Sequence, residues 1–318
     1  MDNVNKIIGK SLTFVESVDG KAVFWVGTEK SFEVYKRHET DIGYTGPVLS
    51  FNDSSIRKWK PELQVEDVKE ILPPKGFKGD ASFGEVKIPC VAFDEKIWWD
   101  SDEIAHHTWT KLQWEVIHNI ATCASDDCTR RYMEVTHVDQ NGDVVATDGK
   151  AMAVMKSSCR LPDELNMRLG TVIPKPKGDV VMTVLPEHWV KFSDGKETFI
   201  VRNETLMEQG NSFPKYERCI PDTRTFSPFT IDLKMCEKNH TFLNQHRNRI
   251  YLSDGNVYVE GKVLGSYKGD VENIPFNWKY LKQTQKAKPM AWFNPDPTKA
   301  CVFGDIDDYF HVVMPMHW

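Results

Sequence analysis

The stretch VVATDGKAMAVM, residues 144–155, has two apolar runs separated by a short polar one, and it decides how the rest of the chain is interpreted. This pattern predicts two antiparallel strands joined by a tight turn. Gly149 can adopt a positive φ without steric cost, and the Asp148 side chain can hydrogen-bond to its own backbone. The hairpin is either a core element of a β-rich domain or, with residues 150–152 exposed, one wall of an apolar groove.

The composition is that of an ordinary globular protein. The chain has 318 residues, 40% of them hydrophobic and 27% charged, enough for two or three domains of about 100–150 residues each. No apolar run is long enough for a transmembrane helix, and residues 1–6 lack the pattern of a signal peptide. Seven scattered cysteines favour a reducing compartment. These features predict a cytoplasmic protein that does not bind a membrane.

The net charge of −6 disfavours a protein that holds nucleic acid by bulk positive charge. A local basic lining with an acidic exterior is still compatible with this balance. Charge alone therefore leaves DNA binding open.

Residues 1–105 are predicted to be mainly β-structure. Two strand-like runs within residues 11–26 flank Asp19-Gly20, which is a strong hairpin signal. The further expected elements are a strand over 31–36, turns over 38–62, an amphipathic helix over 62–72, a loop over 76–84 and a strand over 86–93. A shift in composition places a domain boundary near residue 105.

The order of helix, hairpin and strands occurs twice after this boundary. Thr110 is a candidate cap for the first helix, whose apolar positions fall on one face: Leu112, Val116, Ile117 and Ile120. The expected elements are a helix over 111–124, a strand over 131–138, hairpins over 144–155 and 189–202, an extended link over 212–221, a helix over 233–246, a hairpin through 253–256, a helix from 276 and a strand over 310–318. This repetition predicts an α+β fold of similar modules, with antiparallel sheets and helices on one face.

No catalytic constellation is evident. The sequence lacks a phosphate-binding loop, a dinucleotide fingerprint and a nucleophile elbow. Cys123 and Cys128 have no second pair with which to bind zinc, and His106-His107 lies on a predicted linker. The acidic group Asp305, Asp307 and Asp308 is interpreted as a solvated turn, with a metal-dependent nucleic-acid enzyme as the alternative. We expect a non-enzymatic binding protein without metal or cofactor.

The C-terminal run Val312–Met316 is unusually apolar for a chain terminus. It is either an edge strand that completes a sheet or an adaptable, Met-lined surface for partner peptides. Local sequence does not choose between the two.

Three separated motifs, at residues 146–154, 213–221 and 312–316, together resemble the bacterial DNA polymerase sliding clamp, or β-clamp, family. Residues 276–281 are similar to the start of a helix in the last domain of that family. The resemblance covers residues 107–318, and the first hundred residues carry it only weakly. It implies domains at 1–105 (divergent or shortened), 106–221 and 222–318. Divergence of this degree suggests a phage-encoded member, acting in the bacterial cytoplasm.

The resemblance implies a ring of repeated clamp domains, with sheets outside and helices lining the hole, that encircles duplex DNA without reading its sequence. A homodimer is expected in preference to a trimer. The partners would be a DNA polymerase and a clamp loader that insert a short peptide, and no cofactor is implied. The expected DNA-facing residues are Lys111, Arg130, Arg131, Lys175 and Lys177.

The family's apolar peptide groove lies between the second and third domains. The matching positions are Met133, Thr147, Gly149, Lys150, Ala151, Met152, Pro214, Arg218, Cys219, Asn277, Tyr280, Val312, Val313, Met314, Pro315 and Met316. The family commonly has His-Arg-Leu where this chain has residues 150–152, and Arg-Leu where it has His317-Trp318, so the preferred peptide is expected to differ. The alternative function is a clamp-derived adaptor that binds replication or transcription proteins without encircling DNA.

Overall fold

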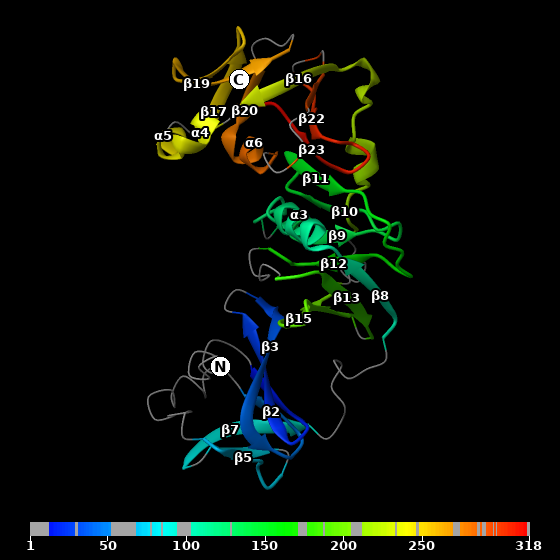
Figure 1. Ribbon diagram of the computed structural model, residues 1–318, viewed down its shortest axis with the longest axis vertical. Helices are drawn as coiled ribbons and strands as arrows, with labels where there is room; N and C mark the ends of the chain where they lie inside the picture. The colour runs from blue at the N-terminus through cyan, green and yellow to red at the C-terminus, as the bar shows by residue number, and fades with distance from the viewer. Residues whose placement is uncertain are drawn as a thin grey trace. The chain divides into compact units, whose positions relative to one another are not determined.

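A computed structural model describes residues 13–28, 31–51, 68–76, 78–83, 85–93, 103–127, 129–170, 177–186, 188–204, 212–232, 234–245, 248–269, 274–284, 287, 291–294, 296 and 298–316. The chain forms two compact units (Figure 1). The first comprises Met1–Trp114 and Pro174–Asn203, and the second comprises Glu115–Ile173 and Glu204–Trp318.

The first unit contains one continuous sheet, in the order β2-β1-β4-β7-β6-β5-β3-β15-β14-β13-β8. Its strands are β1 (Thr13–Val18), β2 (Lys21–Thr28), β3 (Ser31–Tyr44), β4 (Val48–Phe51), β5 (Glu70–Leu72), β6 (Lys78–Phe83), β7 (Val86–Phe93), β8 (Ala105–Trp109), β13 (Val180–Leu185), β14 (Trp189–Ser193) and β15 (Thr198–Arg202).

The first seven strands close into a barrel, because β2 pairs with β3 as well as with β1. Every strand contributes alternate side chains to one buried cluster, including Val15, Phe24, Tyr44, Leu49, Ile71, Phe83 and Ile88. Strand β3 is long enough to leave the barrel, and its residues 34–36 pair with residues 199–201 of β15 (Figure 1). The barrel and the β13–β15 sheet are therefore joined by one shared strand.

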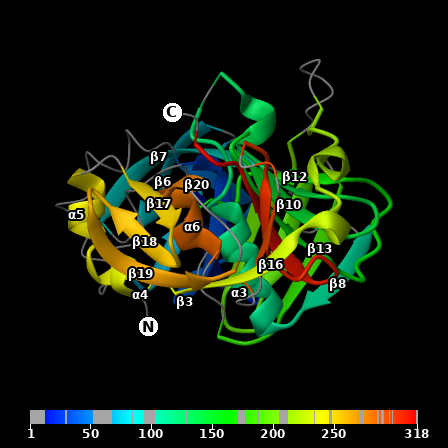
Figure 2. The ribbon, with the colours of Figure 1, turned by 90° about the horizontal axis from the view of Figure 1, so that it is seen from above.

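The second unit contains a sheet in the order β12-β9-β10-β11-β23-β22-β21-β16-β19-β18-β17-β20. Its strands are β9 (Thr136–Val138), β10 (Val144–Thr147), β11 (Ala151–Met155), β12 (Leu165–Met167), β16 (Ser227–Asp232), β17 (Arg249–Ser253), β18 (Asn256–Val259), β19 (Lys262–Lys268), β20 (Ile274–Asn277), β21 (Ala291–Phe293), β22 (Cys301–Gly304) and β23 (Tyr309–Val313). Its helices are the end of α3 (Lys111–Ala121), α4 (Lys234–Lys238), α5 (His240–Gln245) and α6 (Trp278–Thr284), which Figure 2 shows beside β20.

The pairings define repeated modules. The middle module has the strand order β12-β9-β10-β11 in one sheet and β8-β13-β14-β15 in the other, and the last module repeats it as β20-β17-β18-β19 and β16-β21-β22-β23. The first module follows the same plan with β4-β1-β2-β3 and β5-β6-β7. Its described residues include no counterpart of β8 or β16, and β5 instead pairs in parallel with β3. The predicted α+β fold of repeated modules with a divergent N-terminal part is confirmed.

The local signals explain several elements. Asp19 and Gly20 have φ of 51° and 76°, and Asp254 and Gly255 have 50° and 73°, the two positive values that a tight hairpin turn requires. Thr110 caps α3 in a reciprocal box, because Gln113 N donates to Thr110 Oγ1 (3.2 Å) and Thr110 N donates to Gln113 Oε1 (2.9 Å). The hairpins predicted around Asp19-Gly20 and at 144–155, 189–202 and 253–256, and the strand at 86–93, are confirmed.

Other predictions in the first unit are wrong. Residues 38–44 continue β3 and residues 48–51 form β4, where turns were expected. Residues 70–72 are a strand and not a helix end, because Ile71 lies between β3 and β6 in the barrel; residues 62–67 lie outside the described residues. The expected loop at 76–84 contains β6, whose Ala81 and Phe83 point into the core. His106-His107 belongs to β8 and pairs with β13, so it is not on a linker.

Corrections in the second unit concern the ends and breaks of elements. Residues 131–133 form a 3₁₀ turn before β9, another 3₁₀ turn over 216–219 interrupts the expected extended link, and the helix predicted at 233–246 is broken at Asn239 into α4 and α5. The last helix begins at Trp278, and the final strand ends at Val313. Leu112 and Trp114 lie in the part of α3 that belongs to the first unit. Leu112 is 72% exposed and does not share the buried face of the helix; Trp114 takes that place and packs against Phe192 and Phe199.

Candidate functional site

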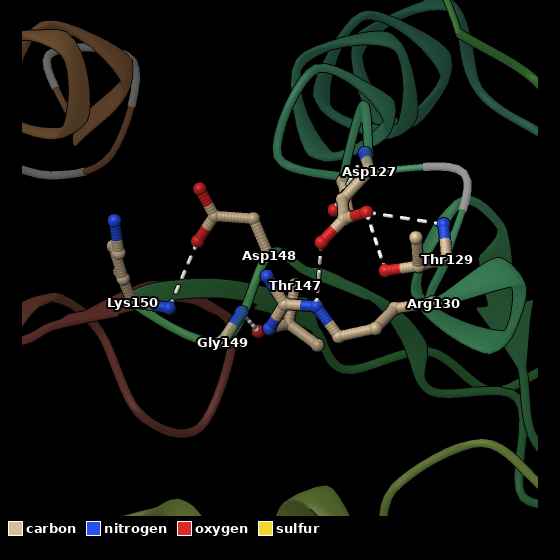
Figure 3. Close-up of polar contacts among 8 residues, drawn as sticks. Asp127, Thr129, Arg130, Thr147, Asp148, Gly149 and Lys150 are labelled. Atoms are coloured by element: carbon tan, nitrogen blue, oxygen red, sulfur yellow. Dashed lines mark hydrogen bonds and ion pairs between the residues drawn. The ribbon is translucent and has the colours of Figure 1, made fainter.

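The turn between β10 and β11 is fixed by its own side chains. Gly149 has a φ of +85°, which a residue without Cβ adopts at no cost. Thr147 Oγ1 accepts from Gly149 N (3.0 Å) and donates to the Ala151 carbonyl (2.7 Å). Asp148 Oδ1 accepts from the backbone N–H groups of Lys150 (2.9 Å) and Ala151 (3.0 Å). The turn is therefore held in one shape, with Lys150 exposed (Figure 3).

Two side chains from the segment before β9 lie over Gly149. A Cβ on Gly149 would be 3.4 Å from Arg130 Nη1 and 3.8 Å from Met133 Sδ. Arg130 is oriented by Asp127, whose carboxylate accepts from Arg130 Nε at 3.0 Å and from Thr129 Oγ1 at 2.6 Å (Figure 3). These are ordinary contact distances, so it is the positive φ of Gly149, and not the space above it, that favours glycine at this position.

The C-terminal segment runs beside the same turn. Strand β23 pairs with β11, so that Ala151 is opposite Val313 and Met152 is opposite Val312. Beyond the strand, Met314 N donates to the Lys150 carbonyl (3.0 Å). Met316 N then donates to the Pro275 carbonyl (2.8 Å). The tail is thus hydrogen-bonded through the backbone of Met314 and Met316, and Met314 is 38% exposed.

The paired strands β11 and β23 have two buried faces. Met152 and Val312 belong to a cluster with Phe213 and Tyr216. Ala151 and Val313 belong to the core of the last module. Of the two alternatives for the hairpin, a core element is the one found, and the alternative in which residues 151 and 152 are exposed is wrong, because each is 5% exposed. Val312 and Val313 are buried as well, because β23 lies between β11 and β22 and is not the edge of the sheet.

Helix α6 is bonded to the turn through Tyr280. Tyr280 Oη donates to Asp148 Oδ2 at 2.7 Å. Burial, and then this bond to a carboxylate, raise the pKa of Tyr280 above its ordinary value. Asn277 begins the helix by accepting from Lys279 N at 2.9 Å. One carboxylate, Asp148, therefore holds both the turn and the helix.

The segment carrying Pro214, Arg218 and Cys219 is anchored by Tyr216. Tyr216 Oη lies 2.8 Å from Asp139 Oδ2 and 3.0 Å from Asp143 Oδ2, and Lys156 is ion-paired with Asp143. Burial, with these carboxylates, raises the pKa of Tyr216. Arg218 and Cys219 are exposed on the 3₁₀ turn that follows. All sixteen residues predicted for the groove lie in the second unit.

A buried polar network behind β23 was not predicted from the sequence. Asn119 of α3 donates to the Gln283 carbonyl (3.1 Å) and is hydrogen-bonded to Tyr309 Oη, which lies 2.7 Å from His311 Nε2. Gln283 Nε2 in turn donates to the Thr122 carbonyl (3.0 Å). Complete burial lowers the pKa of His311 to about 3. The only signal in the sequence was a polar side chain on an otherwise apolar helix face and strand.

The predicted DNA-facing residues are distributed over both units. Lys111 is exposed at the start of α3, and Arg131 is exposed at the start of a 3₁₀ turn. Lys177 is exposed, and its Nζ forms an ion pair with Glu197 Oε1 at 3.8 Å. Arg130 lies at the β10–β11 turn, as described above. Lys175 lies outside the described residues.

The described residues contain no group of three or more His, Cys, Asp or Glu side chains that could hold a metal ion. Asp305, Asp307 and Asp308 form the β22–β23 turn, where Asp305 Oδ1 accepts from Asp307 N at 3.1 Å. Burial raises the pKa of the Cys123 thiol to about 12, which opposes the thiolate form that zinc requires; Cys128 is outside the described residues. Within the described part of the chain, no helix is long and apolar enough to span a membrane.

Comparison with solved structures identifies the fold. A protein from Eubacterium rectale described as a DNA polymerase III beta subunit aligns with a TM-score of 0.67 and 12% identity, over 99% of this chain and 96% of that one. A DNA polymerase sliding clamp from Pseudomonas aeruginosa aligns with a TM-score of 0.63 and 16% identity, over 99% of this chain and 95% of that one. The DNA polymerase III beta subunit from Thermotoga maritima aligns with a TM-score of 0.61 and 16% identity, over 100% of this chain and 94% of that one. No family model matches the chain, and no curated protein matches it.

The class of protein is therefore defined by the fold alone: this is a chain of repeated modules with the DNA-clamp fold. More specifically, it has the fold of the bacterial DNA polymerase III beta sliding clamps over nearly its whole length, with strongly divergent sequence.

Proposed function

We propose that this protein is a DNA sliding clamp, a non-enzymatic processivity factor that encircles duplex DNA without sequence specificity and tethers replication proteins. The observation that carries the proposal is the likeness to sliding clamps over 97–100% of the chain in the structures compared. It is supported by the repeated modules joined through paired strands. A ring holds DNA by topology, so it requires no catalytic group and no base-specific contacts.

The partner groove is proposed at the β10–β11 turn. Gly149, Arg130 and Met133 form one side, and the exposed Met314 marks the other. The turn is rigid, and the tail beside it is held by backbone hydrogen bonds, so a peptide would meet a largely preformed site. Arg130 is thereby reassigned from the DNA-facing set to the groove, where it supplies a guanidinium close to the position at which Ala151 lacks one.

The helices supply a positive surface for DNA in a chain of net charge −6. Among the exposed, described side chains of α3 to α6 are five lysines and two glutamates: Lys111, Lys234, Lys238, Lys279, Lys282, Glu115 and Glu237. Such a surface attracts phosphates weakly and without reading bases. Together with Arg131, Lys175 and Lys177, these lysines are the proposed DNA-facing set.

The decisive experiment loads the protein onto nicked circular duplex DNA and then linearises the circle. A ring is expected to be retained on the circle and to slide off the linear ends. Blocking both ends with bulky protein roadblocks should restore retention. Equal retention on circular and open linear DNA would contradict encirclement, because ordinary surface binding does not depend on topology.

The proposed partners are a DNA polymerase and a clamp loader that insert a short peptide, a Gln followed by apolar anchors, into this groove. With three modules per chain, the proposed ring is a homodimer. Mass measured by sedimentation tests this, since a dimer has twice the 36.6 kDa of one chain. A trimer would indicate that only two modules per chain contribute to the ring.

A second candidate function is a clamp-derived adaptor that binds replication or transcription proteins without encircling DNA. The specific observation in its favour is the closed N-terminal barrel, whose described residues include no counterpart of β8 or β16. A chain that stays monomeric, binds the partner peptide and shows no topological retention would be this adaptor.

A further inference from the structure

The modules of this chain are joined twice by the same kind of strand pair. Residues 34–36 of β3 pair with residues 199–201 of β15, and residues 151–155 of β11 pair with residues 309–313 of β23. Within their modules, β3 and β11 are each the last strand in the order of one sheet, and β15 and β23 are each the last strand in the order of the other sheet. Each joint therefore unites equivalent strands of successive modules.

Applying the same rule once more identifies the two strands that would join one chain to the next. The equivalent of β3 and β11 in the last module is β19. Residues 266–268 of β19 pair with β16, so the part that another strand could pair with is its start, where Val263 is 53% exposed. The equivalent of β15 and β23 in the first module is β7. A second copy of the chain is the natural occupant, because it supplies the β7 that this β19 would pair with.

In the structure, however, the outer side of β7 is occupied. Residues 91–93 of β7 pair with residues 48–50 of β4, and this pairing closes the barrel. The seam has three residue pairs, whereas β1 and β2 share six. We call the β4–β7 pairing the seam.

We propose that the seam is a lock on assembly: while β7 is paired with β4 the chain is monomeric, and a ring forms when β7 leaves β4 and pairs with β19 of a second copy. The inference rests on the proposed clamp function and adds a regulatory step to it. The seam is short, but its central pair, Leu49 and Ala92, is buried in the barrel core. Opening therefore exposes apolar surface, which pairing with β19 would cover again.

A disulfide across the seam tests the lock directly. Ser50 and Val91 are paired, and neither is buried, so Ser50→Cys/Val91→Cys closes the seam under oxidising conditions without changing the core. The matched control is Ser82→Cys/Lys87→Cys, which links β6 to β7 at a pair that no assembly step requires to open. Both are made in a Cys219→Ser background, because Cys219 is exposed, and the bond is verified by peptide mass mapping.

Sedimentation over a range of concentrations is the readout. The oxidised seam variant is expected to associate about tenfold more weakly than its reduced form, and the control pair to associate equally in both states. Equal association of the oxidised and reduced seam variants would overturn the lock, while topological retention on DNA would still support the clamp.

A second variant opens the seam. Val48 pairs with β7 but lies outside the register of β4 with β1, so Val48→Pro weakens the seam without removing a β4–β1 pair. Val48 also packs against Trp25, Tyr35 and Ile200, so Val48→Ala is the control for this lost packing. Its circular dichroism should match the wild type, and it is expected to assemble at lower concentration. If the folded variant is no better at assembly than the wild type, the lock is wrong. If it assembles but is never retained on circular DNA, the clamp proposal fails and the lock stands.

Discussion

Removing one hydroxyl group tests whether α6 holds the β10–β11 turn. In Tyr280→Phe the hydrogen bond from Tyr280 Oη to Asp148 Oδ2, 2.7 Å long, is lost. Tyr280 is 8% exposed, and a hydrogen bond to a charged group contributes about 1.5–3 kcal/mol. Because Asp148 is half-buried and water can replace part of the bond, we expect a loss at the lower end, about 1.5 kcal/mol.

The assay is equilibrium urea unfolding of the full chain. Tyr258→Phe is the matched control, since it removes the same atom in the same module, where Oη makes only a 3.5 Å contact with Asn256. We expect the control to change the free energy of unfolding by less than about 0.5 kcal/mol. Asp148→Asn and the double variant complete a cycle that isolates the coupling between the two side chains.

The functional readout is peptide binding to the proposed groove. Because Asp148 also fixes the backbone of residues 150 and 151, Tyr280→Phe should weaken binding of a Gln-containing apolar peptide, whereas Tyr258→Phe should not. The reasoning is refuted if the two Phe variants are equally stable, or if the cycle gives no coupling between Tyr280 and Asp148.

The remaining predictions concern acid stability, the tail and the helix lysines. His311 is neutral in the folded chain, with a pKa lowered to about 3 by burial, so the unfolded chain takes up a proton first as the pH falls below 6.5. The free energy of unfolding should therefore fall between pH 6.5 and 3 by up to about 1.4 kcal/mol per pH unit. In His311→Leu, the free energy measured by urea unfolding should fall less steeply with decreasing pH; an equally steep fall in the two proteins would contradict this. Deleting residues 314–318 removes the hydrogen bonds of Met314 and Met316 to Lys150 and Pro275. Peptide affinity, measured by fluorescence anisotropy, should therefore be lost, while the sedimentation profile should stay unchanged. Polymerase stimulation that survives the truncation would place the groove elsewhere. Lys279→Gln/Lys282→Gln should lower the slope of log binding constant against log salt concentration for DNA by roughly one unit per lysine. Lys150→Gln is the control, which should affect peptide binding only. An unchanged slope would remove α6 from the DNA-facing surface.

The sequence predicted best those elements whose local chemistry permits one conformation. Asp-Gly pairs between apolar runs gave the hairpins at Asp19-Gly20 and Asp254-Gly255, because both residues must take positive φ there. Thr110 marked the start of α3, where the structure adds Gln113 as its partner in a reciprocal cap. The 144–155 hairpin followed from two uninterrupted β-prone runs around Gly149.

The barrel was missed because its strands depend on distant partners. Lys78–Phe83 contains Gly79 and Asp80, which favour a loop locally, yet alternation places Ala81 and Phe83 in a core built by seven strands. Ile71 has helix-like spacing with its neighbours, and it is a strand residue only because β3 and β6 flank it. Sequence pattern does not contain the pairing that decides these cases.

The motifs assigned the turn, the Tyr280 helix and the tail to the proposed groove, and that assignment stays a prediction. The sequence left the burial of residues 151 and 152 open: Ala151 packs in the core of the last module, and Met152 packs with Phe213. The sequence could not place Arg130, because a lone arginine carries no directional information. Its position over Gly149 depends on Asp127 and Thr129, three-dimensional neighbours that only the folded segment brings into place.

The ladder between β11 and β23 also has a mechanical meaning. A protein pulled by a moving partner at the tail would transmit that force along the axis of β23, and five residue pairs anchor this strand to β11. A load in this direction strains all the rungs at once, in shear, instead of peeling them one by one. Under a load applied at the tail, this five-pair joint should therefore yield later than the three-pair joint between β3 and β15.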